Sequence, residues 1–191
     1  SDEAVDSVRQ YILEQYGKEY LPESKNIYKG RAGAQDAHEA IRPTDVNRTP
    51  ESLKGALTRE QLQLYTLIHN RFVASQMEQA RFDTMTAILE DEKKAIQLRY
   101  YGEAKAFAGF TRIYEEGKDD EQEEKQAPLP KLSTGDKVKI TNADAEQNFT
   151  QPPPRFTEAS LVRTLEENGI GRPSTYAPTI NTLTQRGYVS R

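Results

Sequence analysis

The spacing of hydrophobic residues changes at Arg81, and this change constrains the fold more than any other feature of the sequence. Before it, helical spacing predicts a helix over residues 59–77 with a core stripe formed by Leu64, Tyr65, Ile68 and Phe72. After it, β-formers dominate, and we predict a turn at Gly102 and strands at residues 82–89, 95–101, 105–114 and 137–140. A helical part followed by a β-rich part indicates a mixed, multi-segment α+β fold.

Capping signals predict another helix at the N-terminus and support the predicted start of the helix over residues 59–77. Ser1 is a suitable cap for a helix that ends near Gly17, and Thr58 with Gln61 forms a capping box. The segment 18–46 that follows the first helix is irregular and rich in Gly, Pro and polar residues. Loops of that length are functional or disordered in most proteins, and the sequence leaves open which applies here.

The prolines at 152–154 form a stiff spacer and a natural domain boundary. Beyond it, Thr157 caps a helix that ends near Gly169, a second helix begins at Pro173 or Ser174, and residues 186–189 are predicted to form a strand. Helix, tight connector, helix and strand are typical of a helix-turn-helix with the start of a wing, a shape often used on DNA. A plain helical hairpin explains the pattern equally well, so both interpretations stay open.

The net charge of −4 is set by one acidic run. Residues 115–124 carry a net charge of −6, so the rest of the chain carries +2, and the overall sign does not argue against nucleic acid. We expect the run 115–125 to be a solvated loop. The chain has no cysteine and two distant histidines, so it shows no thiolate or histidine metal motif. The acidic N-terminus and the absence of a long apolar run predict a cytoplasmic protein without membrane contact.

Two segments carry candidate binding chemistry. The connector Gly169–Tyr176 combines one guanidinium with three hydroxyls before a predicted helix start, which suits a phosphate. The segment 34–44 holds an imidazole, two carboxylates and a guanidinium, and His38 with Arg42 is a second candidate phosphate site. The alternative for 34–44 is an ordinary histidine with charge pairs inside a helix.

Four blocks of the sequence resemble bacterial type IA DNA topoisomerases, in order and in spacing. They are Gln-Asp-Ala-His-Glu-Ala-Ile-Arg-Pro-Thr at 35–44, Phe-Val-Ala-Ser-Gln-Met at 72–77, Pro-Pro-Arg-Phe-Thr-Glu-Ala-Ser-Leu-Val at 153–162, and Gly-Ile-Gly-Arg-Pro-Ser-Thr-Tyr-Ala at 169–177. The related topoisomerase III proteins typically have histidine in place of Glu39 and Thr-Asp-Ala in place of residues 172–174. Reverse gyrase shares the Arg-Pro-Ser-Thr-Tyr pattern and stays open as an alternative.

The resemblance implies an enzyme that relaxes negatively supercoiled DNA without ATP. It cuts one strand, holds the 5′ phosphate on a tyrosine, passes another strand through the gap and reseals the break. None of the ten tyrosines here lies in the Met-Arg-Thr-Asp-Ser neighbourhood of the family's nucleophile. We therefore expect an internal fragment that is inactive alone, with Mg²⁺ bound elsewhere in the parent enzyme and no cofactor or metal site in this chain.

The resemblance also implies three segments. Residues 1–80 would be the later part of the helical active-site domain, 81–148 one crossing of a β-rich gate arch, and 149–191 part of the domain that binds the single strand. The arch is normally built from two crossings, so we expect an unpaired sheet edge that favours pairing with another copy. The other expected partners are single-stranded and negatively supercoiled DNA and the remaining domains of the same polypeptide, near the bacterial nucleoid.

Site residues follow from the resemblance position by position. His38 would lie beside the scissile phosphate, with Arg42 supporting it and contacting the backbone. Arg172, Ser174, Thr175 and Tyr176 would line the single-strand groove, and Tyr176 would either stack on a base or pack against the protein. Two other functions remain possible for the isolated chain: a stand-alone module that binds single-stranded DNA, or a protein-interaction module that uses the sheet edge.

Overall fold

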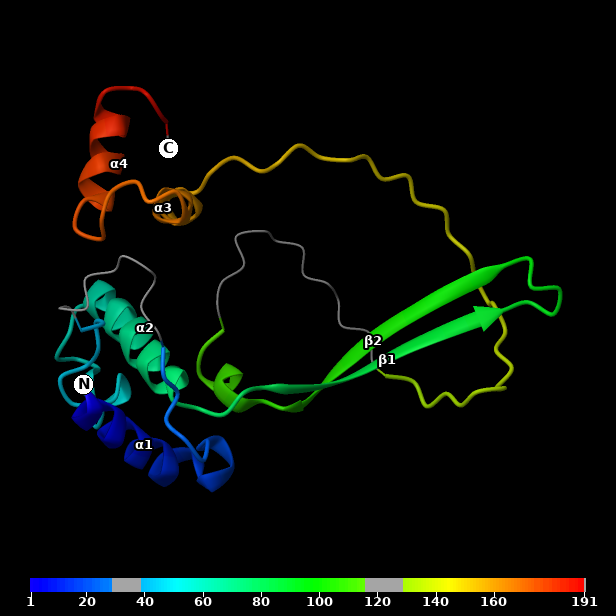
Figure 1. The fold of residues 1–191 in the computed structure, drawn as a ribbon, viewed down its shortest axis with the longest axis horizontal. Helices are drawn as coiled ribbons and strands as arrows, with labels where there is room; N and C mark the ends of the chain where they lie inside the picture. Colours follow the sequence, from blue (N-terminus) through cyan, green and yellow to red (C-terminus); the bar gives the residue numbers. More distant parts are fainter. Residues whose placement is uncertain (29–38, 116–128, 191) are drawn as a thin grey trace. The chain divides into compact units, whose positions relative to one another are not determined.

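The computed structural model describes residues 1–28, 39–115 and 129–190 (Figure 1). The elements are α1 (Asp2–Tyr16), η1 (Lys18–Tyr20), η2 (Glu51–Leu53), α2 (Arg59–Ser75), β1 (Arg81–Glu90), β2 (Gln97–Phe107), η3 (Gly109–Arg112), α3 (Glu158–Glu167) and α4 (Tyr176–Gln185). They belong to two compact units: one holds the elements from α1 to η3, and the other holds α3 and α4. This is the mixed α+β architecture that the sequence predicts. None of the described helices has the length and apolar character needed to cross a membrane.

The helices α1 and α2 begin where their caps predict. The Ser1 hydroxyl accepts the Ala4 N–H at 3.4 Å, and α1 ends at Gly17 with a φ of 92°. At α2, the Thr58 hydroxyl accepts the Gln61 N–H at 3.3 Å while the Gln61 side chain accepts the Thr58 N–H at 2.9 Å. Both halves of the capping box are therefore present. Each satisfies an amide that the first helical turn would otherwise leave without a partner.

The hydrophobic core of the first unit lies between these helices and the chain around them. Its buried members are Val8, Tyr11, Ile12, Tyr20, Val46, Val73 and Met77. The predicted stripe on α2 is wrong in one respect, because Leu64 is 59% exposed and the buried α2 residues are His69 and Val73. The buried imidazole is held by a 2.9 Å contact between its Nε2 and the Val46 carbonyl oxygen.

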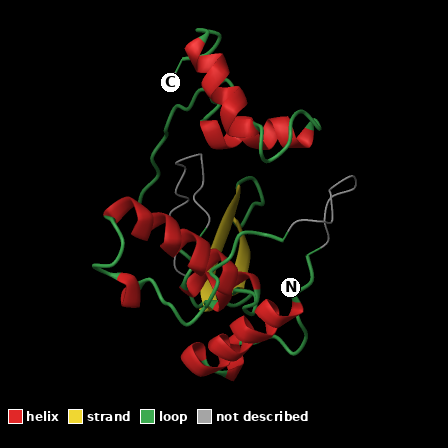
Figure 2. Cartoon of the chain, turned by 90° about the vertical axis from the view of Figure 1, so that its left-hand side faces the viewer, coloured by secondary structure: helices red, strands yellow, loops and turns green. Residues whose placement is uncertain are grey.

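The strands β1 and β2 form an antiparallel hairpin, which Figure 2 shows as the pair of yellow arrows. The register runs from Arg81 opposite Phe107 to Glu90 opposite Gln97. Two predictions are wrong here. Gly102 is not a turn, because it pairs with Met85 inside the sheet. Residues 105–114 are not a third strand, because the chain leaves β2 at Phe107 and enters η3.

The predicted strands at 137–140 and 186–189 are also absent, because these residues are irregular in the structure. The described sheet therefore has two strands, and each has one edge without a β partner in the described part of the chain. The expected self-association through such an edge stays a prediction. The three-segment boundaries and the solvated loop at 115–125 stay predictions as well, and most of that loop lies outside the described residues.

The base of the hairpin is joined to the helical body by main-chain hydrogen bonds centred on Glu78. Its N–H donates to the Tyr20 carbonyl oxygen at 2.9 Å, and its carbonyl oxygen accepts the Phe110 N–H at 2.9 Å. The rings of Tyr20 and Phe107 lie 4.8 Å apart, centroid to centroid, beside them. Gly109 starts η3 with a φ of 49° and lies so close to residues 79–80 that a Cβ would be 2.4 Å from the Gln79 carbonyl carbon.

Candidate nucleic-acid interface

The connector between α3 and α4 begins with a glycine that ends α3. Gly169 has a φ of 69°, in the left-handed region that glycine adopts without strain. Its N–H donates to the Glu166 carbonyl oxygen at 3.0 Å, and the Ile170 N–H donates to the Leu165 carbonyl oxygen at 2.8 Å. This pair of bonds is a Schellman motif, which satisfies the last carbonyls of the helix. The chain therefore turns sharply at Gly169, as the sequence predicts.

The second half of the connector is folded around Thr175. Its hydroxyl accepts the Arg172 N–H at 2.8 Å and donates to the Arg172 carbonyl oxygen at 3.0 Å. Gly171 has a φ of 80°, and a Cβ there would be 3.1 Å from the Tyr176 ring. Helix α4 consequently starts at Tyr176, three residues after Pro173, and not at Pro173 or Ser174 as predicted. The connector is a turn stabilised by its own side chains.

The connector presents Arg172, Ser174 and Thr175 to solvent, with Tyr176 half-buried. The Arg172 Nη1 donates to the Gly171 carbonyl oxygen at 2.7 Å, which points the guanidinium back along the connector. Within the described residues, no carboxylate lies at ion-pair distance from Arg172. A phosphate could therefore approach its positive charge without first displacing an acid.

Backbone amides add less to this site than a helix start usually does. The N–H groups of Thr175 and Tyr176 donate to the Arg172 carbonyl oxygen at 2.8 and 3.2 Å, and the Thr179 N–H donates to the Thr175 carbonyl oxygen at 3.0 Å. The Arg172 N–H is occupied by Thr175, as described above. Proline at 173 and 178 removes two further donors. Side chains, led by the guanidinium, are thus the main groups offered to an anion.

The second candidate site centres on Arg42, in the first unit. Its Nε and Nη2 donate to the two Glu39 carboxylate oxygens at 2.7 and 3.2 Å, and its Nη1 donates to the Pro43 carbonyl oxygen at 3.1 Å. The Ser1 amino group lies 2.6 Å from Glu39 Oε1. The Arg42 hydrogen bonds, followed by those of the amino group, lower the pKa of Glu39 to about 2. The pairing thus persists throughout the neutral range.

A polar pocket of about 250 Å³ lies beside Arg42. Its lining includes the carboxylates of Glu3 and Asp45 and the side chain of Ser7, which come from α1 and from the chain after Arg42. Sequence reasoning missed these three residues, because their approach to Arg42 depends on how residues 43–47 pack on α1 and no local motif encodes it. The pocket's charge is mixed, so Arg42 is the group in it that suits a phosphate.

His38, the proposed neighbour of the scissile phosphate, lies outside the described residues. Arg42 is not in a helix, so the Glu39–Arg42 pair is not the intrahelical pair that the alternative interpretation expected. Arg42 and Arg172 belong to different units of the structure. In the described part of the chain, no three His, Asp or Glu side chains gather as metal ligands. The expected absence of a metal site in this chain and the binding of Mg²⁺ elsewhere in the parent enzyme both stay predictions.

Comparison with known proteins gives two concordant results. A family model described as DNA topoisomerase matches residues 1–191. The fold is similar to that of full-length topoisomerase I from Thermotoga maritima, with a TM-score of 0.73 and 31% sequence identity. The match covers 100% of this chain and 29% of that chain. Since the family model matches from the first residue to the last, the chain belongs to the bacterial type IA DNA topoisomerase family.

Proposed function

We propose that the chain is part of a type IA topoisomerase that relaxes negatively supercoiled DNA. The parent enzyme would cut one strand, hold its 5′ phosphate on a tyrosine, pass another strand through the gap and reseal the break, without ATP and with Mg²⁺. The observation that carries this proposal is the family match over all 191 residues. Because the chain spans 29% of the Thermotoga maritima enzyme, this activity is proposed for the parent protein and not for the chain alone.

For the chain itself we propose DNA binding through the connector between α3 and α4. Its support is chemical: an exposed guanidinium without a carboxylate partner in the described part of the chain, next to the exposed hydroxyls of Ser174 and Thr175. Tyr176 is half-buried and its ring lies over Gly171, so it braces the turn and leaves part of its surface for a base. Negatively charged single strands are the ligand that this set of groups suits best.

Arg42 has a supporting role in the proposal. All three of its side-chain nitrogens already donate to protein oxygens. A DNA phosphate would have to replace the Glu39 carboxylate or share the guanidinium with it. This exchange would let Arg42 stay ordered before DNA arrives and contact the backbone, next to His38, once it is bound.

The nucleophile is the first part of the proposal to test. Because none of the ten tyrosines lies in the family's nucleophile motif, we expect no covalent adduct when the chain is incubated with 3′-labelled single-stranded DNA. The Thermotoga maritima enzyme is the positive control in the same buffer with Mg²⁺. A labelled adduct of this chain would show that it carries a reactive tyrosine after all, and would overturn the claim that it is inactive alone.

DNA binding is tested by fluorescence anisotropy with a short single-stranded oligonucleotide. If ~3 phosphates are neutralised, the slope of log affinity against log salt is about −2, and affinity falls roughly 15-fold between 50 and 200 mM salt. Arg172→Ala should weaken binding and make the slope shallower by about 0.7. Arg163→Ala, an exposed arginine on α3, is the matched control. Equal loss in both variants would refute the assignment of the connector.

One observation favours a second role, in protein contacts. Both strands of the hairpin have an edge without a β partner among the described residues, and such edges pair readily with other strands. Sedimentation velocity over a range of protein concentrations tests this role. If the chain stays monomeric at all concentrations, self-association through the hairpin is refuted.

A further inference from the structure

The first unit contains a pocket of about 420 Å³ where the end of α2 meets η3. Three aromatic side chains from two distant stretches of the chain line it: Tyr28 from one, and Phe110 and Tyr114 from the other. Arg71 and Met77 line it as well. Neither the connector nor the Arg42 cluster includes any of these residues. The volume lies within the range of about 300–1,000 Å³ that small-molecule sites occupy.

The inner part of the pocket is apolar and belongs to the core. Met77 is 1% exposed and is a core member, and Phe110 packs partly buried against the same cluster. Main-chain bonds fix both residues, since the Met77 N–H donates to the Ala74 carbonyl oxygen at 3.1 Å and the Phe110 N–H to the Glu78 carbonyl oxygen at 2.9 Å. The apolar surface open to a ligand is therefore that of Phe110, which is already fixed in place with Met77 packed in the core beside it.

Tyr28 provides an exposed aromatic wall that is nonetheless held in place. The residue is 71% exposed, yet its hydroxyl donates to the Ser75 carbonyl oxygen at 2.7 Å. Two residues earlier, the Asn26 amide donates to the carbonyl oxygens of Ser75 and Met77 at 3.0 and 3.2 Å. The chain that carries the ring is therefore fixed to the end of α2. A ring held before binding costs less ordering entropy when a ligand stacks on it.

Tyr114 and Arg71 form the other aromatic element. The Arg71 Nη1 donates to the Tyr114 hydroxyl at 2.7 Å, and the guanidinium carbon lies 5.6 Å from the centre of the ring. The hydrogen bond and the cation–π contact hold the two side chains together. Arg71 is exposed, so its positive charge reaches the solvent side of the pocket while Tyr114 is half-buried.

We propose that this pocket binds one base of a single-stranded DNA, with the adjoining phosphate near Arg71. An apolar inner surface, fixed aromatic rings and one cation are the groups that bind single strands without sequence preference. An apolar protein side chain would use the same inner surface but would gain nothing from the guanidinium. The inference rests on the proposed function in one respect, because it assumes that the chain meets single-stranded DNA.

The test compares two oligonucleotides of equal length, one with bases and one with abasic sites at the central positions. Both carry the same phosphates, so they differ only in the bases offered to the pocket and to Tyr176 of the connector, and the Tyr28 variants tell these two base contacts apart. Anisotropy should show that the wild-type chain prefers the oligonucleotide with bases. Tyr28→Ala should lower affinity for that oligonucleotide about 5-fold or more, the low end for one base–aromatic stack, and leave affinity for the abasic one unchanged. Tyr28→Phe, which keeps the ring, should stay within about 2-fold of wild type.

Tyr188→Ala is the matched control, because Tyr188 is also 71% exposed and lies outside the pocket. Circular dichroism confirms that each variant is folded. As a direct readout, an oligonucleotide with 5-iododeoxyuridine is cross-linked by light and the adduct is mapped by mass spectrometry. Adducts on Tyr28 or Tyr114 support the pocket, and adducts confined to the α3–α4 unit refute it.

The outcomes separate the two proposals. Binding that depends on Arg172 but is unchanged in Tyr28→Ala overturns the base pocket alone. Loss of base preference in Tyr188→Ala as large as in Tyr28→Ala also overturns it. If the wild-type chain binds neither oligonucleotide, the proposed DNA binding fails and the base pocket fails with it.

Discussion

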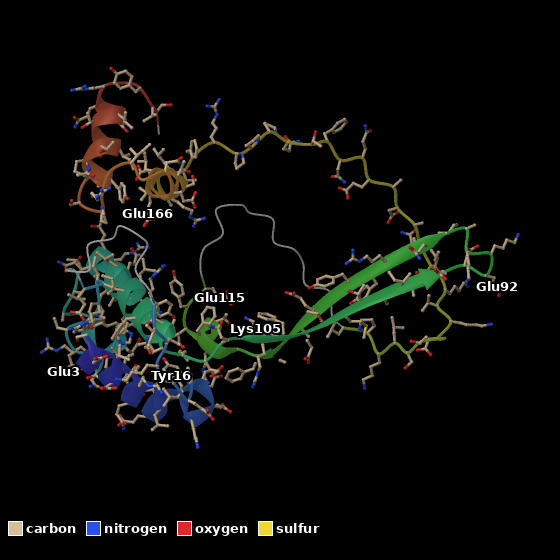
Figure 3. All side chains as sticks on the ribbon, in the orientation of Figure 1. Glu3, Tyr16, Glu92, Lys105, Glu115 and Glu166 are labelled. Carbon is tan, nitrogen blue, oxygen red and sulfur yellow. The ribbon has the colours of Figure 1, made fainter. Side chains whose placement is uncertain are left out.

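The two helix pairs of this protein, α1 with α2 and α3 with α4, use the same devices at their ends but differ in what they bury. Threonine caps begin α2 and α3, and glycines end α1 and α3. The first pair contributes four residues to a common core, whereas α3 has no buried residue and α4 has one, Ile180. The difference teaches that caps decide where a helix begins and ends, and burial decides how strongly it is held. Side chains of both pairs are drawn in Figure 3.

The largest expected effect concerns the buried side chains. Ile12 is fully buried, so Ile12→Ala should lower the free energy of unfolding of the first unit by about 2–5 kcal/mol. Leu165 in α3 is half-buried, and Leu165→Ala should cost the second unit about 1 kcal/mol. Unfolding in urea, monitored by amide hydrogen exchange in each unit, measures the loss of stability in both variants. Equal losses would break the comparison between the two pairs.

The next effect concerns the base of the hairpin, which the second pair lacks. At Gly109 a Cβ would lie 2.4–2.5 Å from the main chain of residues 79–80, so Gly109→Ala should destabilise the first unit by roughly 2–3 kcal/mol. Gly55 has a positive φ of 87° but an open surrounding, and Gly55→Ala should cost only about 1 kcal/mol. Thermal unfolding of the two variants compares their losses of stability. It thereby separates the cost of the steric contact at Gly109 from the cost of backbone strain alone at Gly55. A cost at Gly55 as large as at Gly109 would show that strain alone explains both.

The caps should have smaller effects that differ in kind. Thr58→Ala and Thr157→Ala each remove a side-chain acceptor, at a cost of about 1 kcal/mol. In α2 the buried residues hold the helix in place, so its amides should stay protected from hydrogen exchange. In α3 the first turn should exchange rapidly once the cap is lost. Similar protection in the two variants would mean that α3 is held by contacts as strong as those of α2.

The two candidate DNA-contacting arginines also differ between the units: Arg42 is paired with Glu39, whereas Arg172 has no carboxylate partner among the described residues. The pKa of Glu39 measures how strong the pairing is. Arg42 holds the pKa of Glu39 at about 2, below the ordinary value of 4.5. Because the folded value is the lower one, the pair stabilises the fold fully above pH 4.5, and this contribution is lost as the pH falls towards 2. The carboxyl carbon shift of Glu39, followed by NMR, should titrate near pH 2 and move towards 4.5 in Arg42→Ala. A midpoint near 4.5 in the wild type would show that Arg42 is as free as Arg172.

Local signals explain which parts of the fold were predictable. The caps at Ser1, Thr58 and Thr157 act within three or four residues, so the sequence shows them directly. Gly102 was misassigned because glycine fits both a turn and a strand, and its pairing with Met85 depends on the register of the hairpin. Residues 105–114 have the composition of a strand, but contact with residues 79–80 and with the core makes them turn at Gly109.

The candidate sites divide in the same way. The connector lies where the sequence places it, because glycines and hydroxyls within eight residues determine it. Its helix starts later than predicted, because the bonds between Thr175 and Arg172 use the residues that would form the first turn. The pocket at Arg71 and Tyr114 was not predicted. Its lining comes from three separate stretches of the chain, which meet only because η3 and the segment that carries Tyr28 both pack against the end of α2.

The attachment of the hairpin at Glu78 has a mechanical consequence. Both strands leave the body beside one residue, whose N–H and carbonyl oxygen are bonded to Tyr20 and Phe110. The hairpin can therefore be treated as a rigid rod that pivots at Glu78, and β1 gives this rod a length of 10 residues. At about 3.3 Å per residue the strand is about 33 Å long, so a tilt of about 10° at Glu78 would move its far end by about 6 Å. A small change in the hydrogen bonds of Glu78 would therefore displace the far end of the hairpin by a much larger distance.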